Sequence, residues 1–272
     1  MVPVLTTVFC VITLLVSLIL PILALVVYAL RHKKQGVWSA WGLGALGFVI
    51  PQMCIRSPIL AVLQKQNWFL LFAQNHLFAY TFCLALTAGL FELAGRFASA
   101  QLMRRNLTAA RGLAAGMGHG GIEAMALIGT AYINNLVFII LLNNGGLDAL
   151  VSQTAAAGGD PAPLLYYRDT LCNTASILFL LAGLERLLTM ISHAAMSMLV
   201  CYGVAHKKAL PCALVCLAIH TCLDMAAGIP ILAGAAMSQA TAYCIVYLIL
   251  VIVAAAAVYL IRDLRRRWNP AP

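Results

Sequence analysis

The stretch Gly116-Met-Gly-His-Gly-Gly-Ile-Glu123 marks the point where a basic loop gives way to a long apolar run. His119 and Glu123 are four residues apart, so a helix would place both side chains on one face. Ionisable groups inside a membrane segment are costly and commonly functional. Gly116 and Gly120, at the same spacing, are typical of close helix packing in membranes. The stretch therefore predicts a membrane helix that packs closely, carries a functional His–Glu pair, or does both.

The composition of the whole chain is that of an integral membrane protein. Of its 272 residues, 63% are hydrophobic and only 9% are charged. The mean hydropathy is +0.96. We expect a single membrane domain over residues 1–272, because nothing in the sequence suggests a second, soluble domain. The formal net charge of +9 does not indicate nucleic acid, since Lys and Arg fall mostly in short loops, where they set membrane orientation.

Seven apolar runs are long enough to cross a bilayer, which takes about 20 residues. They cover approximately residues 4–30, 38–63, 68–102, 112–142, 171–204, 209–232 and 240–261. The segment from Asn143 to Asp169 is rich in Gly, Asn and Pro, which predicts a turn-rich loop outside the bilayer. Arg56, in the second run, is expected to extend its side chain to the nearby interface. The sequence thus predicts an all-α bundle of about seven transmembrane helices.

Basic residues alternate between the predicted loops. Those after the first, third and fifth spans and the C-terminal tail carry Lys and Arg, whereas the other loops carry few. Basic loops favour the cytoplasm, so we expect the N-terminus outside and the C-terminus inside. The protein should be a multi-pass protein of the cell membrane in contact with lipid. No internal repeat is evident, which disfavours an inverted-repeat transporter.

Ionisable residues recur at helical spacing within four of the predicted spans. Half of the eight acidic residues and four of the six His, including His76, fall inside spans, where each charge costs about 3 kcal/mol. The spaced sets are Glu92 and Arg96; His119 and Glu123; Glu185, His193 and Ser197; and Cys212, Cys216, His220 and Asp224. Counted from the basic ends, most lie about 12–21 Å deep, and Glu185 about 35 Å. We expect the interior members to meet in one polar cavity.

A carboxylate beside two or three His side chains can activate water and stabilise an oxyanion. The same groups can bind zinc, with His119, His193 and His220 as candidate ligands. The sequence has neither the HExxH motif nor an evident Ser-His-Asp set. A zinc site at Cys212, Cys216 and His220 is less expected than simple packing of these side chains.

The motifs Glu92-x-x-x-Arg96, Gly-x-Gly-His119-Gly-Gly-x-Glu123, Glu185-Arg186…His193-x-x-x-Ser197 and His220-x-x-x-Asp224 together resemble the YhfC family of intramembrane metalloproteases. That family is related to the type II CAAX prenyl proteases and the bacteriocin-processing CPBP proteases. The resemblance extends over nearly the whole chain. It implies that Glu92 is the base and Arg96 its partner, and that His119, His220 and Asp224 orient water and the oxyanion. Phe91 stands where the relatives have a first glutamate, so Glu123 is a competing base.

We therefore predict an intramembrane protease that hydrolyses membrane-borne protein or peptide substrates with activated water, with a divalent metal such as zinc as a candidate cofactor. A proton-coupled transporter, in which the same groups relay protons, and a non-catalytic membrane scaffold are the alternatives. No nucleic-acid partner is expected. The predicted catalytic residues are Glu92, Arg96, His119, Glu123, His193, His220 and Asp224, with Glu185 and Arg186 in support.

Overall fold

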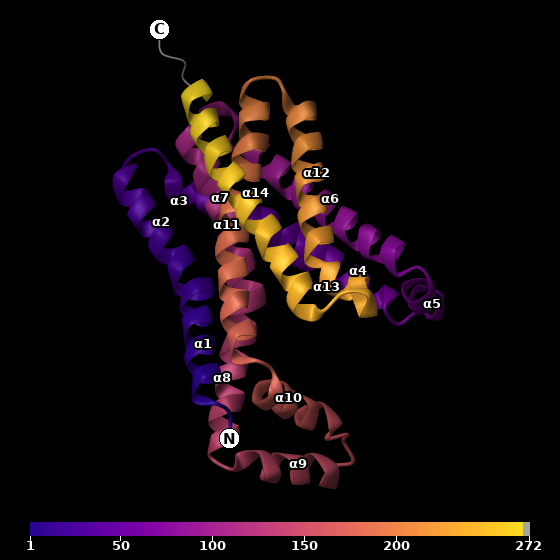
Figure 1. Cartoon of the computed structure of the whole chain (residues 1–272). Coiled ribbons are helices and arrows are strands. Elements are labelled where there is room, and N and C mark those ends of the chain that lie inside the picture. The colour runs from indigo at the N-terminus through magenta and orange to yellow at the C-terminus, as the bar shows by residue number, and fades with distance from the viewer. Residues whose placement is uncertain (269–272) are drawn as a thin grey trace. The chain divides into compact units, whose positions relative to one another are not determined.

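The computed structural model describes residues 1–268, which fold into helices joined by short turns, without a β-strand in that range (Figure 1). Seven of the described helical segments are long and apolar enough to cross a bilayer. They are Val4–Arg31, Val37–Leu63, Leu77–Leu102, Ala109–Asn143, Ser176–Ala205, Ala209–Ala227 and Gln239–Trp268. This confirms the predicted seven-span, multi-pass membrane protein. The orientation of the termini stays a prediction.

Residue contacts divide the chain into two compact units. The first comprises Met1–Ile22 and Ala124–Leu187, and the second comprises Leu23–Glu123 and Leu188–Pro272. The single-domain organisation expected from the sequence stays a prediction, and each unit is described by itself. The interior members of the predicted site, from Glu92 to Asp224, all belong to the second unit.

The first unit is held together by hydroxyl groups that bond across its helices. It contains α1 (Val4–Leu14), a π-helical segment (Leu15–Ile19), α8 (Thr130–Asn143), α9 (Gly146–Ala156), α10 (Ala162–Asn173) and the first part of α11 (Ser176–Ala205). Thr13 Oγ1 and Tyr132 Oη both donate to the Phe179 carbonyl, at 2.7 and 2.9 Å. Buried hydroxyl groups need such hydrogen-bond partners, because unpaired polar groups in an apolar interior are costly. These bonds therefore fix the packing of α1, α8 and α11.

The prediction of an irregular loop between Asn143 and Asp169 was wrong, since α9 and most of α10 lie there. The Gly and Pro residues that suggested turns instead mark the helix ends. Gly145 and Gly158 have φ of 73° and 74°, a conformation that glycine adopts without steric cost. Asp160 Oδ1 accepts the Ala162 N–H at 2.9 Å, as in capping of a helix N-terminus. The fifth span accordingly begins after α10.

The second unit contains the remaining helices. They are α2 (Leu20–Arg31, of which Leu20–Ile22 belong to the first unit), α3 (Val37–Phe48), a π-helical segment (Val49–Arg56), α4 (Ser57–Leu63), α5 (Asn67–Asn75), α6 (Leu77–Leu102), a 3-10 turn (Arg104–Asn106), α7 (Ala109–Ala124), the rest of α11, α12 (Ala209–Ala227), α13 (Ile229–Ala233), a second 3-10 turn (Gly234–Ala236) and α14 (Gln239–Trp268). Two predicted spans are shorter than expected. His76 interrupts the third between α5 and α6, and Gly228 ends the sixth.

Glycines allow the helices of the second unit to approach one another closely. A Cβ added to Gly95 on α6 would lie 1.7 Å from the Gly47 carbonyl oxygen on α3. One added to Gly118 on α7 would lie 2.0 Å from the Trp41 carbonyl oxygen, and one on Gly116 would lie 2.6 Å from Ala194 Cα on α11. Small residues at such contacts are the usual means of packing helices in lipid. They bring α3, α6, α7 and α11 together around the polar residues described next.

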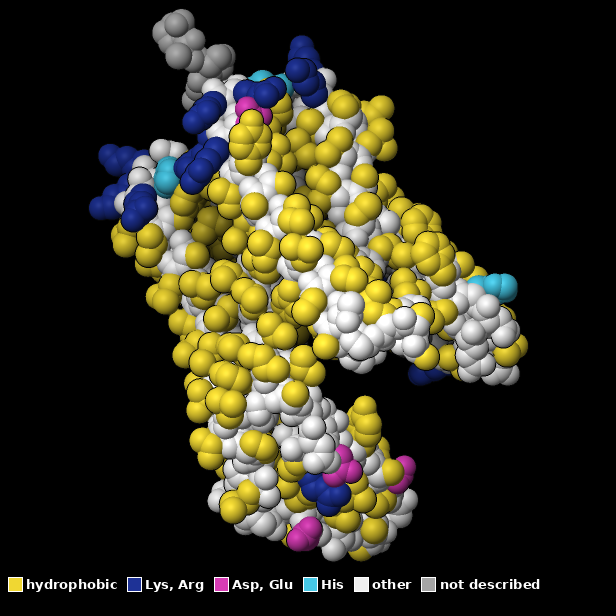
Figure 2. Space-filling model, viewed as in Figure 1, with side chains coloured by type: hydrophobic (Ala, Val, Ile, Leu, Met, Phe, Trp, Pro, Cys, Tyr) yellow, Lys and Arg dark blue, Asp and Glu magenta, His cyan; other side chains and the backbone are white. Residues whose placement is uncertain are grey.

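The flanks of the helices are apolar and their ends are basic, as expected for membrane spans. Figure 2 shows Lys and Arg side chains gathered over the turn between α11 and α12 and the C-terminal end of α14, with hydrophobic side chains along these helices. The basic residues there are Lys207, Lys208, Arg262, Arg265, Arg266 and Arg267, all of them exposed.

Candidate active site

Glu92, near the middle of α6, is the centre of the polar cluster. Its side chain is only 4% exposed, and its Oε2 accepts hydrogen bonds from Arg96 Nη2 and His119 Nε2, both at 3.0 Å. The nearest nitrogens of His193 and His220 lie 3.7 and 3.6 Å from the same oxygen. One carboxylate oxygen is therefore surrounded by a guanidinium and three imidazoles. Burial of a carboxylate is tolerated when it is paired and hydrogen-bonded in this way.

Each side chain reaches the cluster because of its helical register. Glu92 and Arg96 are one turn apart on α6, and His119 comes from α7. His193 with Ser197 on α11, and His220 with Asp224 on α12, are further pairs separated by four residues. The glycines next to His119 face other helices, as Gly120 would meet His193 Cβ at 2.8 Å if it carried a Cβ. Both interpretations of the glycine-rich stretch are thus compatible: the glycines pack α7, and His119 enters the cluster.

Arg96 connects Glu92 to α11. Besides the carboxylate, its guanidinium contacts His193 Nδ1 at 2.6 Å and Ser197 Oγ at 3.2 Å. A guanidinium has only N–H donors, so His193 Nδ1 must accept and His193 Nε2 must carry the ring proton. That nitrogen lies 3.0 Å from Glu123 Oε2. Glu123 thereby places a carboxylate beside the protonated nitrogen of His193.

His220 and Asp224 lead from the buried carboxylate to the surface of the second unit. His220 Nε2 lies 3.3 Å from Asp224 Oδ2, and its other nitrogen faces Glu92. The Asp224 side chain is 39% exposed, compared with 4% for Glu92 and for His220. The two residues therefore form a short polar path from Glu92 to an exposed carboxylate.

Three buried polar atoms of the cluster have no hydrogen-bond partner among the residues that the structure describes. They are Arg96 Nη1, His119 Nδ1 and His220 Nδ1. Buried donors and acceptors are nearly always satisfied in folded proteins, by water or a bound group if not by protein. Donor and acceptor capacity is thus available around Glu92 for a water molecule and for the polar atoms of a substrate.

Comparison with known proteins identifies the family of the chain. A family model described as YhfC intramembrane metalloprotease matches residues 16–254. The chain belongs to the YhfC family. The membrane protein YhfC of Bacillus subtilis (strain 168), described as uncharacterized, is 29% identical over 196 residues, which cover 72% of this chain and 74% of that protein. No solved structure matches the chain.

Because the family is described as metalloproteases, the next question is which residues of this site could bind a metal ion. Glu92, His119 and His193 are all buried and offer ligand atoms that lie within 4.8 Å of one another. Carboxylate and imidazole are suitable zinc ligands, so these residues fit a metal site in type and spacing. The set differs from the expected one, in which His220 was the third ligand. Arg96 Nη2 already contacts Glu92 Oε2 and His193 Nδ1, so a metal bound through these two atoms would have to displace it.

Arg56 is a membrane-embedded charge that the sequence had assigned to the interface. It ends the π-helical segment Val49–Arg56 and donates to the Leu84 carbonyl at 2.7 Å and to Thr87 Oγ1 at 3.3 Å, both on α6. It also interacts electrostatically with Asp224 and Glu92. A general rule could have identified Arg56 from the sequence: an Arg inside a membrane span is by default a candidate functional residue. Its place is beside the polar path rather than in the ring around Glu92.

Three of the residues named in the sequence analysis lie outside the cluster around Glu92. His76 is exposed at the break between α5 and α6. Glu185 and Arg186 pair with each other in the first unit, so their supporting role stays a prediction. The remaining residues predicted from the sequence are brought together around Glu92 by four helices of the second unit.

Proposed function

We propose that this chain is an intramembrane protease in which Glu92 is the general base for attack of water on a peptide bond of a membrane-borne substrate. The observation that carries the proposal is the burial of one carboxylate among Arg96 and three imidazoles. Packing alone gives no reason to place such a set in a membrane span, because each charge there is costly. The family's description supports the same reaction class.

Hydrolysis assigns each neighbour of Glu92 a role. Glu92 takes a proton from water, and the hydroxide formed adds to the substrate carbonyl carbon. The carbonyl oxygen becomes an oxyanion, and Arg96 Nη1 is a buried donor without a hydrogen-bond partner in the described part of the chain that is available to stabilise it. Collapse of the adduct breaks the C–N bond, and Glu92 returns its proton to the leaving amine. Arg96 offsets the cost of burying Glu92 as an ion.

Glu123 is the rival base, and its contacts favour a positioning role. Its Oε2 lies against His193 Nε2, whereas Glu92 Oε2 is the atom that Arg96 and all three imidazoles surround. A divalent ion held by Glu92, His119 and His193 would supply Lewis-acid activation of water. With Glu92 committed to an ion, Glu123 is the nearby carboxylate that could accept a proton.

The test compares cleavage by the full chain and by Glu92→Gln in membranes, with new peptide termini inside hydrophobic segments identified by mass spectrometry. We expect Glu92→Gln to reduce formation of these termini about 10²–10⁴-fold, as for loss of a general base. Asp148→Asn, in α9 of the first unit, is the matched control and should cleave normally. Equal cleavage by wild type and Glu92→Gln would overturn the proposal.

Metal content, measured on the same purified proteins, separates the two roles of Glu92. If the carboxylate acts only as a base, wild type and Glu92→Gln should carry equal amounts of metal. If it is a ligand, Glu92→Gln should lose bound metal, and Glu123→Gln should lose cleavage while keeping the metal. Loss of cleavage in Glu123→Gln with full activity in Glu92→Gln would move the base assignment to Glu123.

A further inference from the structure

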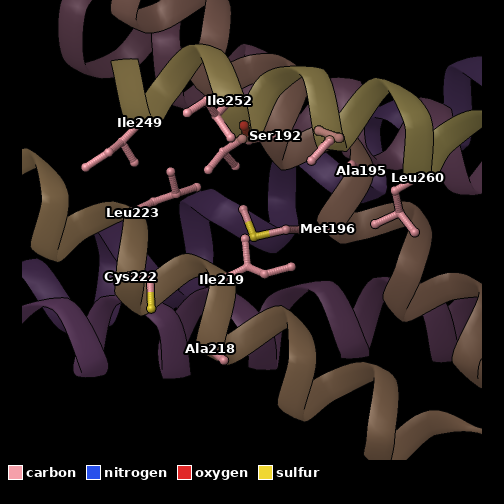
Figure 3. Close-up of a pocket in the computed structure, with 13 residues that line it drawn as sticks. Ser192, Ala195, Met196, Ala218, Ile219, Cys222, Leu223, Ile249, Ile252 and Leu260 are labelled. Atoms are coloured by element: carbon pink, nitrogen blue, oxygen red, sulfur yellow. The ribbon is translucent and has the colours of Figure 1, made fainter. Parts of the chain in front are cut away.

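An apolar cavity lies beside the candidate active site in the second unit. It has a volume of about 390 Å³ and is lined by α11, α12 and α14 (Figure 3). In that view Met196, Ile219 and Leu223 extend into the space between α12 and α14. Ser192 supplies the only hydroxyl of the lining, and it is bonded to the Leu188 carbonyl of its own helix. The cavity therefore offers a ligand almost no polar partner.

The length of the cavity matches one leaflet of a bilayer. Along α14 its lining runs from Ile249 to Leu260, which corresponds to about 16 Å at 1.5 Å per residue. The hydrocarbon core of a bilayer is about 30 Å thick, so half of it is about 15 Å. Ile252, at 58% exposure, and the exposed Cys222 leave the side of the cavity open to lipid.

The volume is too small to enclose a helix. A helix is about 10–12 Å wide and rises 5.4 Å per turn, so three turns along this length would need well over 1,000 Å³. A cavity of about 390 Å³ instead has the size of a single small ligand. An extended hydrocarbon chain is long, narrow and apolar, as the cavity requires.

The end of the cavity near Leu260 adjoins a basic surface. On α14 the first Arg follows Leu260 by two residues, and Arg267 lies on the face that lines the cavity. The turn between α11 and α12, the other two walls, carries Lys207 and Lys208, both exposed. Figure 2 shows these basic side chains together at the ends of the three helices. The one acidic residue in this part of α14, Asp263, pairs with Arg267, so an anionic headgroup at this end would meet a predominantly basic surface.

We propose that this cavity binds one acyl chain of an anionic phospholipid, whose phosphate lies against the basic surface formed by Lys207, Lys208 and Arg267. The site is independent of the proposed proteolysis. It does share helices with the active site, because α11 carries Ser192 beside His193 and α12 carries Ile219 beside His220. A bound chain would therefore brace the two helices that hold these imidazoles.

The acyl chain is tested by native mass spectrometry of the full chain with dioleoyl-phosphatidylglycerol as the probe. Ala256→Trp fills the cavity, whereas Ala255→Trp places the same ring on an exposed part of α14 outside the lining. We expect Ala256→Trp to lower the bound fraction at least about 10-fold and Ala255→Trp to leave it unchanged. Equal lipid binding by both variants would overturn the proposal. It would also be overturned if Ala256→Trp kept its lipid but lost a protein dimer, because the cavity would then be an interface between two copies of the chain.

The headgroup is tested with the double variant Lys207→Gln/Lys208→Gln. The matched control is Lys33→Gln/Lys34→Gln, because both turns carry adjacent Lys residues and one Lys with positive φ, at Lys34 and Lys207. Each Lys near a membrane surface contributes about a factor of five to binding of anionic lipid, so the first variant should lose roughly 25-fold. The control should keep wild-type binding. If dioleoyl-phosphatidylcholine binds wild type as tightly as the anionic lipid, the headgroup assignment is wrong.

Discussion

Replacing Arg96 by Met tests whether the candidate site is built around one buried ion pair. Arg96 Nη2 and Glu92 Oε2 lie 3.0 Å apart with side chains 1% and 4% exposed. At an effective dielectric constant near 20, opposite charges at this distance attract by about 5–6 kcal/mol. Desolvation offsets much of that attraction, but removing one partner leaves the other charge buried and unpaired. Such losses cost about 3–5 kcal/mol.

The assay is the apparent midpoint of thermal unfolding of the purified full chain, with all variants in the same detergent. A loss of about 3–5 kcal/mol corresponds to roughly 6–20 °C, using 2–4 °C per kcal/mol for chains of about this size. Arg56→Met is the matched control, since the hydrogen bonds of Arg56 go to the neutral Leu84 carbonyl and Thr87 hydroxyl and its interaction with Asp224 and Glu92 is electrostatic. Its loss should cost about 1.5–3 kcal/mol, as for hydrogen bonds of a charged group.

A double variant makes the result specific to the charge pair. Glu92→Gln/Arg96→Met removes both charges and should be more stable than Arg96→Met alone, because no unpaired carboxylate remains. The reasoning is refuted if Arg96→Met shifts the midpoint no more than Arg56→Met does. It is also refuted if the added Glu92→Gln lowers the midpoint further.

Two further predictions concern packing and topology. Gly95→Ala should strongly destabilise the fold, because its Cβ would lie 1.7 Å from the Gly47 carbonyl oxygen. Gly42→Ala should be tolerated, because nothing lies within 4 Å of the added Cβ. Similar midpoints of thermal unfolding for the two variants would show that α3 and α6 do not pack here. For topology, an impermeant thiol reagent applied to intact cells should label a cysteine at Asp160 and spare one at Arg266, and the opposite pattern would reverse the predicted orientation.

The sequence predicted the spans and most of the residues that meet around Glu92, because both depend on local patterns. Apolar length identifies a membrane helix, and spacing by four residues identifies the shared face of Glu92 with Arg96 and of His220 with Asp224. The glycine-rich stretch correctly indicated a close helix contact at Gly116. What failed were features that depend on where a helix stops, such as the break at His76 and the two helices α9 and α10.

Contacts between helices could not be derived from the sequence. Spacing could place His193 on one face of α11, but it could not show that its two nitrogens contact Arg96 and Glu123 on different helices. Likewise, Arg56 was expected at the interface because a long side chain can reach it. Its actual partners are the Leu84 carbonyl and Thr87, which only the packing of the π-helical segment against α6 makes available.

The position of Arg96 bears on how a metalloprotease family could use this site. Its Nη2 lies 3.0 Å from Glu92 Oε2 and 2.6 Å from His193 Nδ1, and both residues belong to the buried group that could hold a metal ion. A divalent ion held by these two atoms would be repelled by the guanidinium charge. Arg96 and such an ion would therefore compete for Glu92 and His193. With Arg96 in place, as in this structure, the carboxylate of Glu92 is paired with a side-chain cation, and the proposed role of Glu92 is that of the base.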